Sequence, residues 1–289
     1  MNPLPRKLFA TALLAAATTL AACGGGAAAQ EDRAGISVVT SSYPLEFVAA
    51  AVAGGRAQVA NLTPPGADTH GLELSPQQVG SLGEADLVVH LSGLQPAVDA
   101  ALDQQAPAHV VDAAPLADLR GDPHFWLDPR RMADLGHDVA AGLTEVDPAG
   151  AAEYDAAAGR LEDSLTALDT EFTQALEPCR GATLVTSHEA FGYLAARYGL
   201  QQVGIAGIDP HVEPTPARVR DVVDAVRGRG VRTVFFEATT SPAVAETFAD
   251  DLGAGTSVLH PVERVGTGQD YPGLLHENLE ALRTGLTCG

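Results

Sequence analysis

The stretch DPAGAAEYDAAAGRLEDSLTALDTEFTQALEP, residues 147–178, decides the fold of this chain. Its apolar positions recur every three or four residues, at Ala151, Tyr154, Ala158, Leu161, Leu165, Leu168, Phe172 and Leu176. That spacing predicts a single helix, which Asp147-Pro148 opens and Pro178 closes. A helix of about 30 residues would be about 45 Å long. We therefore expect it to run along two lobes and to join them rigidly, because its apolar stripe must pack on both.

Short apolar runs, which we interpret as strands, lie on both sides of this helix. Those before it are Ile36–Thr40, Val59–Leu62, Leu87–Leu91 and Val110–Asp112. Those after it are Thr183–Thr186, Gln202–Ile205, Thr233–Phe236 and Ser257–Leu259. Helical patterns alternate with the runs, at Pro76–Ala85, Pro129–Thr144, Ala190–Tyr198, Pro216–Arg229 and Pro242–Leu252.

Continuous apolar runs that alternate with helices are typical of parallel strands covered on both faces. We therefore predict an α/β protein with two doubly wound parallel-sheet lobes bridged by one long rigid helix. The expected division is an N-terminal lobe over residues 36–146, the bridging helix over 147–178 and a C-terminal lobe over 179–289.

The first residues have the pattern of an export signal. Arg6 and Lys7 precede the apolar segment Leu8–Leu20, whose 13 residues are too few for a membrane span, which needs about 20. Leu20-Ala21-Ala22-Cys23 resembles a bacterial lipobox. We predict a lipoprotein signal peptide over residues 1–22, lipidation of Cys23 and a flexible tether over 23–35. An ordinary secretory signal with a chance cysteine is the alternative. Either way the mature protein is expected to be extracytoplasmic, and with a lipid it is anchored to the cell membrane.

Two further cysteines, Cys179 and Cys288, remain in the mature chain. An even pair in an oxidising compartment favours a disulfide, which would tie the C-terminal tail to the start of the second half. Free thiols or a zinc site are the alternatives. Neither cysteine has a second one at C-x-x-C spacing, so the disulfide is favoured.

Composition limits the possible partners. The 289 residues include 37 acidic and 17 basic side chains, a formal net charge of −20, and only 5% aromatic residues. A surface this acidic repels phosphate backbones, and few aromatic rings are available for base stacking. Nucleic-acid binding is therefore excluded, whereas a cationic ligand suits the charge.

Four of the nine histidines lie in the segments that follow predicted strands. They are His70, His124, His188 and His260, two from each predicted lobe. In open α/β sheets, ligands bind at the carboxyl ends of the strands. We therefore expect these imidazoles to converge in the crevice between the lobes. Their sequence spacing matches no local metal motif, so convergence in the fold carries the prediction.

Four segments resemble the zinc- and manganese-type metal substrate-binding lipoproteins of bacterial ABC importers, the zinc-specific solute-binding protein family. They are residues 66–70 (GADTH), 122–129 (DPHFWLDP), 185–193 (VTSHEAFGY) and Tyr271–Leu282. The resemblance covers nearly the whole mature chain, and the second and third segments are its most specific motifs. It implies two α/β lobes joined by one long helix with the metal between them. By position, the first three ligands of the family fall on His70, His124 and His188.

The fourth ligand departs from the family pattern. The family usually has an aspartate just after the last strand, where this chain has His260. We expect His260 to coordinate, which would give four nitrogen ligands. Glu237, Glu263 or a water molecule are the alternatives, with Glu237 as the main one.

Three or four imidazoles favour zinc over manganese, because manganese prefers oxygen ligands and its family members typically carry a carboxylate at the third position. The resemblance implies a non-enzymatic protein that captures Zn²⁺ with high affinity outside the cell membrane. Its partners would be the transmembrane permease of an ABC importer and its cytoplasmic ATPase, and the protein is expected to be a monomer. The alternatives are a secreted zinc-dependent hydrolase with three histidines and a water, or a metal-binding surface adhesin. Against the hydrolase, His188-Glu189 begins a H-E-x-x-H motif but Gly192 replaces its second histidine. Affinity is expected to fall as the pH drops through about 6.5, the ordinary pKa of imidazole.

Overall fold

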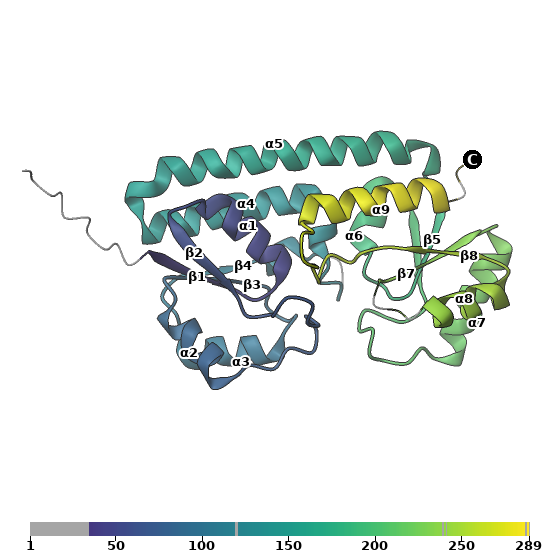
Figure 1. Ribbon diagram of the computed structural model, residues 1–289, viewed down its shortest axis with the longest axis horizontal. Helices are drawn as coiled ribbons and strands as arrows, with labels where there is room; N and C mark the ends of the chain where they lie inside the picture. Colours follow the sequence, from purple (N-terminus) through teal and green to yellow (C-terminus); the bar gives the residue numbers. More distant parts are fainter. Residues whose placement is uncertain (1–34, 119–120, 239, 241, 287, 289) are drawn as a thin grey trace, which may run out of the picture. The chain divides into compact units, whose positions relative to one another are not determined.

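The chain forms two parallel β-sheets (Figure 1). The computed structural model describes residues 35–118, 121–238, 240, 242–286 and 288. The expected signal peptide, Cys23 and the expected tether up to residue 34 lie outside the described residues. Within the described ranges, no helix is both long enough and apolar enough to cross a bilayer.

The two sheets have the same topology. The first has the order β2-β1-β3-β4, with β1 (Ile36–Thr40), β2 (Ala57–Asn61), β3 (Leu87–His90) and β4 (Val110–Asp112). The second has the order β6-β5-β7-β8, with β5 (Thr183–Thr186), β6 (Gln201–Gly204), β7 (Thr233–Phe236) and β8 (Gly255–Val258). Every neighbouring pair is parallel. The predicted fold class is therefore confirmed, although β2, β6 and β8 begin one or two residues earlier than the apolar runs indicated.

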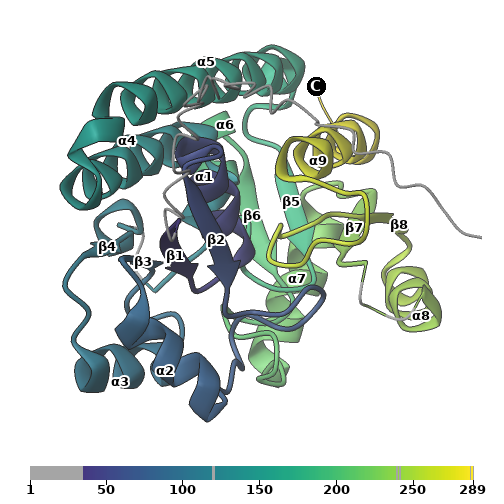
Figure 2. The same cartoon turned by 60° about the vertical axis from the view of Figure 1, so that its left-hand side comes forward.

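Helices cover both faces of each sheet (Figure 2). In the first half they are α1 (Tyr43–Ala53), α2 (Pro76–Glu84), α3 (Pro96–Gln105) and α4 (Pro129–Val146). In the second half they are α6 (Gly192–Tyr198), α7 (Pro216–Gly228), α8 (Pro242–Leu252) and α9 (Tyr271–Gly285). Successive residues of a strand point to opposite faces. Val38 accordingly packs with α1 and α4, whereas its neighbour Val39 packs with α2 and α3.

The long helix α5 (Ala151–Leu176) has 26 residues and runs along both sheets (Figure 1). It is about 39 Å long at 1.5 Å per residue. Short 3₁₀ turns at Pro148–Gly150 and Glu177–Cys179 take up the ends of the segment that the sequence predicted as one helix. Its buried stripe belongs to one hydrophobic cluster that contains Leu87 of the first sheet and Leu184 of the second. Because this core is continuous across both sheets, α5 holds them as a rigid support.

The disulfide between Cys179 and Cys288 joins the end of the segment after α5 to the segment after α9. The predicted pairing is confirmed. The lobe boundaries at residues 146 and 178 stay a prediction.

Candidate metal centre

Four side chains from four loops meet between the two sheets. His70 follows β2, His124 lies in the segment after β4, His188 follows β5 and Glu263 follows β8. One ligand atom from each lies within 4.8 Å of all the others. The rings of His70 and His188 lie 5.4 and 5.5 Å from that of His124, between centroids. Three of the four predicted histidines are thus brought together at the carboxyl ends of the strands.

Asp68 positions His70 through an Asx turn. Its Oδ1 accepts a hydrogen bond from the backbone N–H of His70 at 2.8 Å. Gln95 also holds this loop: its buried amide donates a hydrogen bond to the carbonyl of Thr69 at 3.1 Å. The loop that carries His70 is therefore fixed at two points before any metal is bound.

His124 is fully buried and held by carboxylates on both ring nitrogens. Its Nδ1 lies 2.7 Å from Asp122 Oδ1, and its Nε2 lies 2.7 Å from Glu263 Oε1. Burial alone would lower the pKa of His124, but the two carboxylates outweigh it and raise that pKa to about 9. Without metal, the imidazole is therefore protonated at neutral pH.

His188 is the candidate ligand with an unpaired ring nitrogen facing the cluster. Its ring is 1% exposed, and its Nδ1 lies 2.6 Å from Glu237 Oε1. Its buried Nε2 has no hydrogen-bond partner among the described residues. Leaving a buried polar atom unpaired is costly, so this nitrogen is suited to an ion at the centre of the cluster.

Glu263 reaches the cluster from a sharply turned loop. The buried Val262 before it has a φ of 61°, a left-handed conformation that is strained for a β-branched residue. Trp126 fixes the same loop by donating from Nε1 to the carbonyl of Pro261 at 2.7 Å. Burial works against ionisation of Glu263, but hydrogen bonds from His124 and His70 hold its pKa well below the usual range.

The structure does not bring His260, the expected fourth ligand, into the cluster. The side chain of Asn278 clamps both backbone groups of His260, accepting from its N–H and donating to its carbonyl, each at 2.7 Å. The imidazole is thereby directed toward α9, where its Nε2 lies 3.1 Å from Glu277. Glu263, kept in the sequence analysis only as an alternative, lies where His260 was expected.

Glu237, the other alternative for the fourth ligand, lies outside the cluster on the far side of the His188 ring. It contacts His188 Nδ1 and accepts a hydrogen bond from Ser187 at 3.1 Å. Asp122 contacts His124 Nδ1 in the same way. Carboxylates placed behind imidazole ligands fix the ring orientation and leave Nε2 free to coordinate. Three imidazoles and one carboxylate form a donor set that suits tetrahedral zinc.

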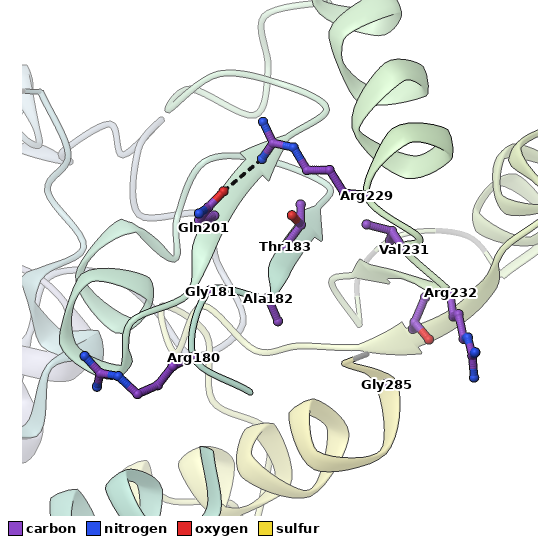
Figure 3. Close-up of a pocket in the computed structure, with 10 residues that line it drawn as sticks. Arg180, Gly181, Ala182, Thr183, Gln201, Arg229, Val231, Arg232 and Gly285 are labelled. Atoms are coloured by element: carbon purple, nitrogen blue, oxygen red, sulfur yellow. Dashed lines mark hydrogen bonds between the residues drawn. The ribbon is translucent and has the colours of Figure 1, made fainter. Parts of the chain in front are cut away.

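A cavity lies at the amino ends of the strands of the second sheet, opposite the end at which His188 and Glu263 lie. Its volume is about 330 Å³, and residues at the amino ends of β5 and β7 line it, among them Thr183 and Thr233. The guanidinium groups of Arg180 and Arg232 extend away from each other, whereas Arg229 hydrogen-bonds to Gln201 (Figure 3). These cationic groups do not converge on a common point, so we assign no binding site to this cavity.

Comparison with known proteins gives related sequences and folds. The zinc-binding protein AdcA of Streptococcus pyogenes serotype M6 is 35% identical over 167 residues, covering 56% of this chain and 32% of that protein. The chain therefore spans about a third of the length of this curated relative. The crystal structure of the laminin-binding protein Lbp of Streptococcus pyogenes is 33% identical, with a TM-score of 0.78, covering 88% of this chain and 100% of that one.

The Zn(II)-bound ZnuA-like domain of Streptococcus pneumoniae AdcA is 29% identical, with a TM-score of 0.76, covering 87% of this chain and 98% of that one. The family model described as "Zinc-uptake complex component A periplasmic" matches residues 38–285. That match includes both sheets except the first two residues of β1, together with α5 and the whole His/Glu cluster. The chain belongs to this family of zinc-uptake complex components.

Proposed function

We propose that this protein captures Zn²⁺ outside the cytoplasmic membrane and delivers it to an ABC importer. The observation that carries the proposal is the convergence of His70, His124, His188 and Glu263 within 4.8 Å of one another. Three of the four are fully or almost fully buried, so an ion held by them would be largely withdrawn from water. The strongly acidic chain also attracts a divalent cation.

Zinc suits these donors better than manganese does. Zinc accepts imidazole and carboxylate in a four-coordinate shell, whereas manganese prefers more oxygen atoms. The Zn(II)-bound ZnuA-like domain of the pneumococcal relative supports zinc as the ion carried by this chain. With four protein ligands the shell is closed, which suits capture and release without bond chemistry.

The proposal extends to partners and location. A permease in the membrane and its cytoplasmic ATPase would receive and drive the transport of the ion, as the family's description as an uptake-complex component supports. A lipid on Cys23 would keep the protein at the outer surface of that membrane. The protein would act as a monomer.

The two alternative functions have less support. A zinc hydrolase needs an open coordination position for water, and in the proposed site Glu263 would occupy the fourth position. A laminin-binding function belongs to the streptococcal neighbour by its description. We do not assign laminin binding to this chain.

Two alanine substitutions three residues apart test the fourth ligand. We expect Glu263→Ala to weaken zinc binding by about 10²- to 10³-fold, since four ligands share a binding free energy of about 10–16 kcal/mol in structural zinc sites. His260→Ala should change the affinity by less than about threefold, because its ring faces Glu277. The measurement is competition with a chelator at pH 7.5, with manganese titrated in parallel.

Either of two results would refute the assignment. The first is a loss of affinity in His260→Ala with none in Glu263→Ala, which would restore His260 as the ligand. The second is absence of tight one-to-one zinc binding by the wild-type protein, which would overturn the proposed function itself.

The single tryptophan should report metal binding. Trp126 is fully buried, and its ring lies 5.2 Å from that of His124, between centroids. A protonated imidazole quenches indole emission, and zinc must displace the proton from His124. We therefore expect tryptophan fluorescence to rise on addition of one equivalent of zinc and to stay constant with calcium. Unchanged emission in protein shown by the competition assay to hold zinc would contradict this assignment.

A further inference from the structure

Just outside the cluster, a second contact joins the loop that carries His70 to the loop that carries Glu263, in addition to the contact between these two ligands. Asp68, in the loop after β2, forms an ion pair through Oδ2 with Nη2 of Arg264, in the loop after β8. His211, in the loop after β6, adds a weaker contact, with its Nε2 3.2 Å from the same oxygen. None of these three side chains belongs to the cluster of four candidate ligands.

Asp68 links this pair directly to a ligand. While Oδ2 faces Arg264, Oδ1 accepts from the backbone N–H of His70 at 2.8 Å. On the other side, Arg264 directly follows Glu263 in the chain. The Asp68–Arg264 pair therefore runs parallel to the contact between His70 and Glu263, which lie 3.1 Å apart.

The position of the pair gives it more effect than an exposed ion pair would have. The side chains of Asp68 and Arg264 are 21% and 31% exposed, so solvent only partly screens their attraction. A charge-assisted hydrogen bond in such a place is stronger than a neutral one. Arg264 also brings a positive charge next to a cluster that contains the carboxylate of Glu263 and is flanked by those of Asp122 and Glu237.

We propose that the Asp68–Arg264 pair is a latch that holds the two ligand-bearing loops together and sets the rate at which bound zinc leaves. Release of an ion from four ligands on four loops requires these loops to separate. The pair crosses the same gap as the ligands, so it must break before or during release. This inference rests on the proposed zinc-binding function, and it assigns Asp68 and Arg264 as positioning residues that do not touch the metal.

Dissociation kinetics test the latch. Zinc-loaded protein is mixed with excess chelator in a stopped-flow instrument, and the release rate is followed by the absorbance of the chelator. We expect Arg264→Gln and Asp68→Asn each to speed release about tenfold. Asp68→Asn retains an oxygen that can accept from the N–H of His70, so it removes the charge while keeping the turn. Arg264→Lys keeps the positive charge and should restore most of the slow release.

A double variant separates a latch from two unrelated effects. If the two residues act through their mutual contact, Asp68→Asn combined with Arg264→Gln should release zinc no faster than either single variant. Arg283→Gln is the matched control, because Arg283 pairs with Glu280 on the exposed face of α9. It should leave the rate unchanged. Melting temperatures of the metal-free variants should match the wild type, which excludes a general loss of stability.

Several outcomes would overturn the latch. They are unchanged release from Arg264→Gln, multiplicative effects in the double variant, or equal acceleration by Arg283→Gln. If the wild-type protein binds zinc tightly, any of these results refutes the latch alone. Failure of the wild-type protein to retain zinc at all refutes the proposed function.

Discussion

The apparent affinity for zinc should fall by about a thousandfold between pH 8 and pH 5. The cause is His124, whose pKa rises to about 9 because Asp122 and Glu263 hold its charged form inside the protein. Zinc and the proton compete for the same nitrogen. Below a pKa of about 9, each unit of pH therefore costs up to a factor of about ten in affinity. The loss begins well above pH 6.5, where the sequence alone placed it.

The same competition predicts proton release. At pH 7.5 the binding of zinc should release about one proton from His124, measurable by titration calorimetry in buffers of different ionisation enthalpy. Asp122→Asn is the informative variant. It removes one of the two carboxylates that raise the pKa of His124, so the affinity should become less dependent on pH between 9 and 7. An affinity that stays constant from pH 8 to pH 6 in the wild-type protein would show that no buried imidazolium is displaced.

Much of the fold could be predicted because its signals are local. The three- to four-residue spacing over residues 147–178 indicated α5, and continuous apolar runs indicated parallel strands. The ends of these elements were less predictable. The periodic positions run from Ala151 to Leu176, the bounds of α5, but Asp147-Pro148 and Pro178 were interpreted as its ends, and Pro148–Gly150 and Glu177–Cys179 form 3₁₀ turns. Ala57 and the polar Gln58 precede the apolar run of β2 in sequence, yet they pair with β1 through backbone hydrogen bonds that no apolar pattern reveals.

The candidate site also has a part that could be predicted from the sequence and a part that could not. His70, His124 and His188 follow strands, so topology alone brings them to one edge. The fourth position depends on contacts distant in sequence. Asn278 clamps His260 from a helix 18 residues away, and the left-handed backbone at Val262 turns Glu263 inward. Neither feature has a local signature, so proximity to the end of β8 favoured His260, whereas the structure brings Glu263 into the cluster. The available signal for the fourth position was Glu263, an acidic residue three positions after His260.

Removal of the disulfide is expected to lower the free energy of unfolding by about 5 kcal/mol. The bond between Cys179 and Cys288 closes a loop with a sequence separation of 109 residues, and that loop contains the whole second sheet. Without the bond, the unfolded chain regains the conformational freedom of this long loop, which the chain-entropy model values at about 5 kcal/mol. For a protein of this size, the melting temperature should drop by about 10–20 °C. Differential scanning calorimetry of metal-free Cys179→Ala/Cys288→Ala protein measures the change.

Alanine is the suitable replacement because Cys179 is buried in the apolar core that α5 shares with both sheets, where a serine hydroxyl would lack a partner. Reductant supplies the matched control. It should destabilise the wild-type protein by a similar amount and leave the double variant unaffected. The disulfide adjoins the amino end of β5, whereas His188 follows its carboxyl end. At 20 °C the double variant should therefore still be folded and bind zinc with wild-type affinity. A melting temperature within about 3 °C of the wild type would mean that contacts of α9 with α5 already restrain the C-terminal segment, and that the covalent link adds little.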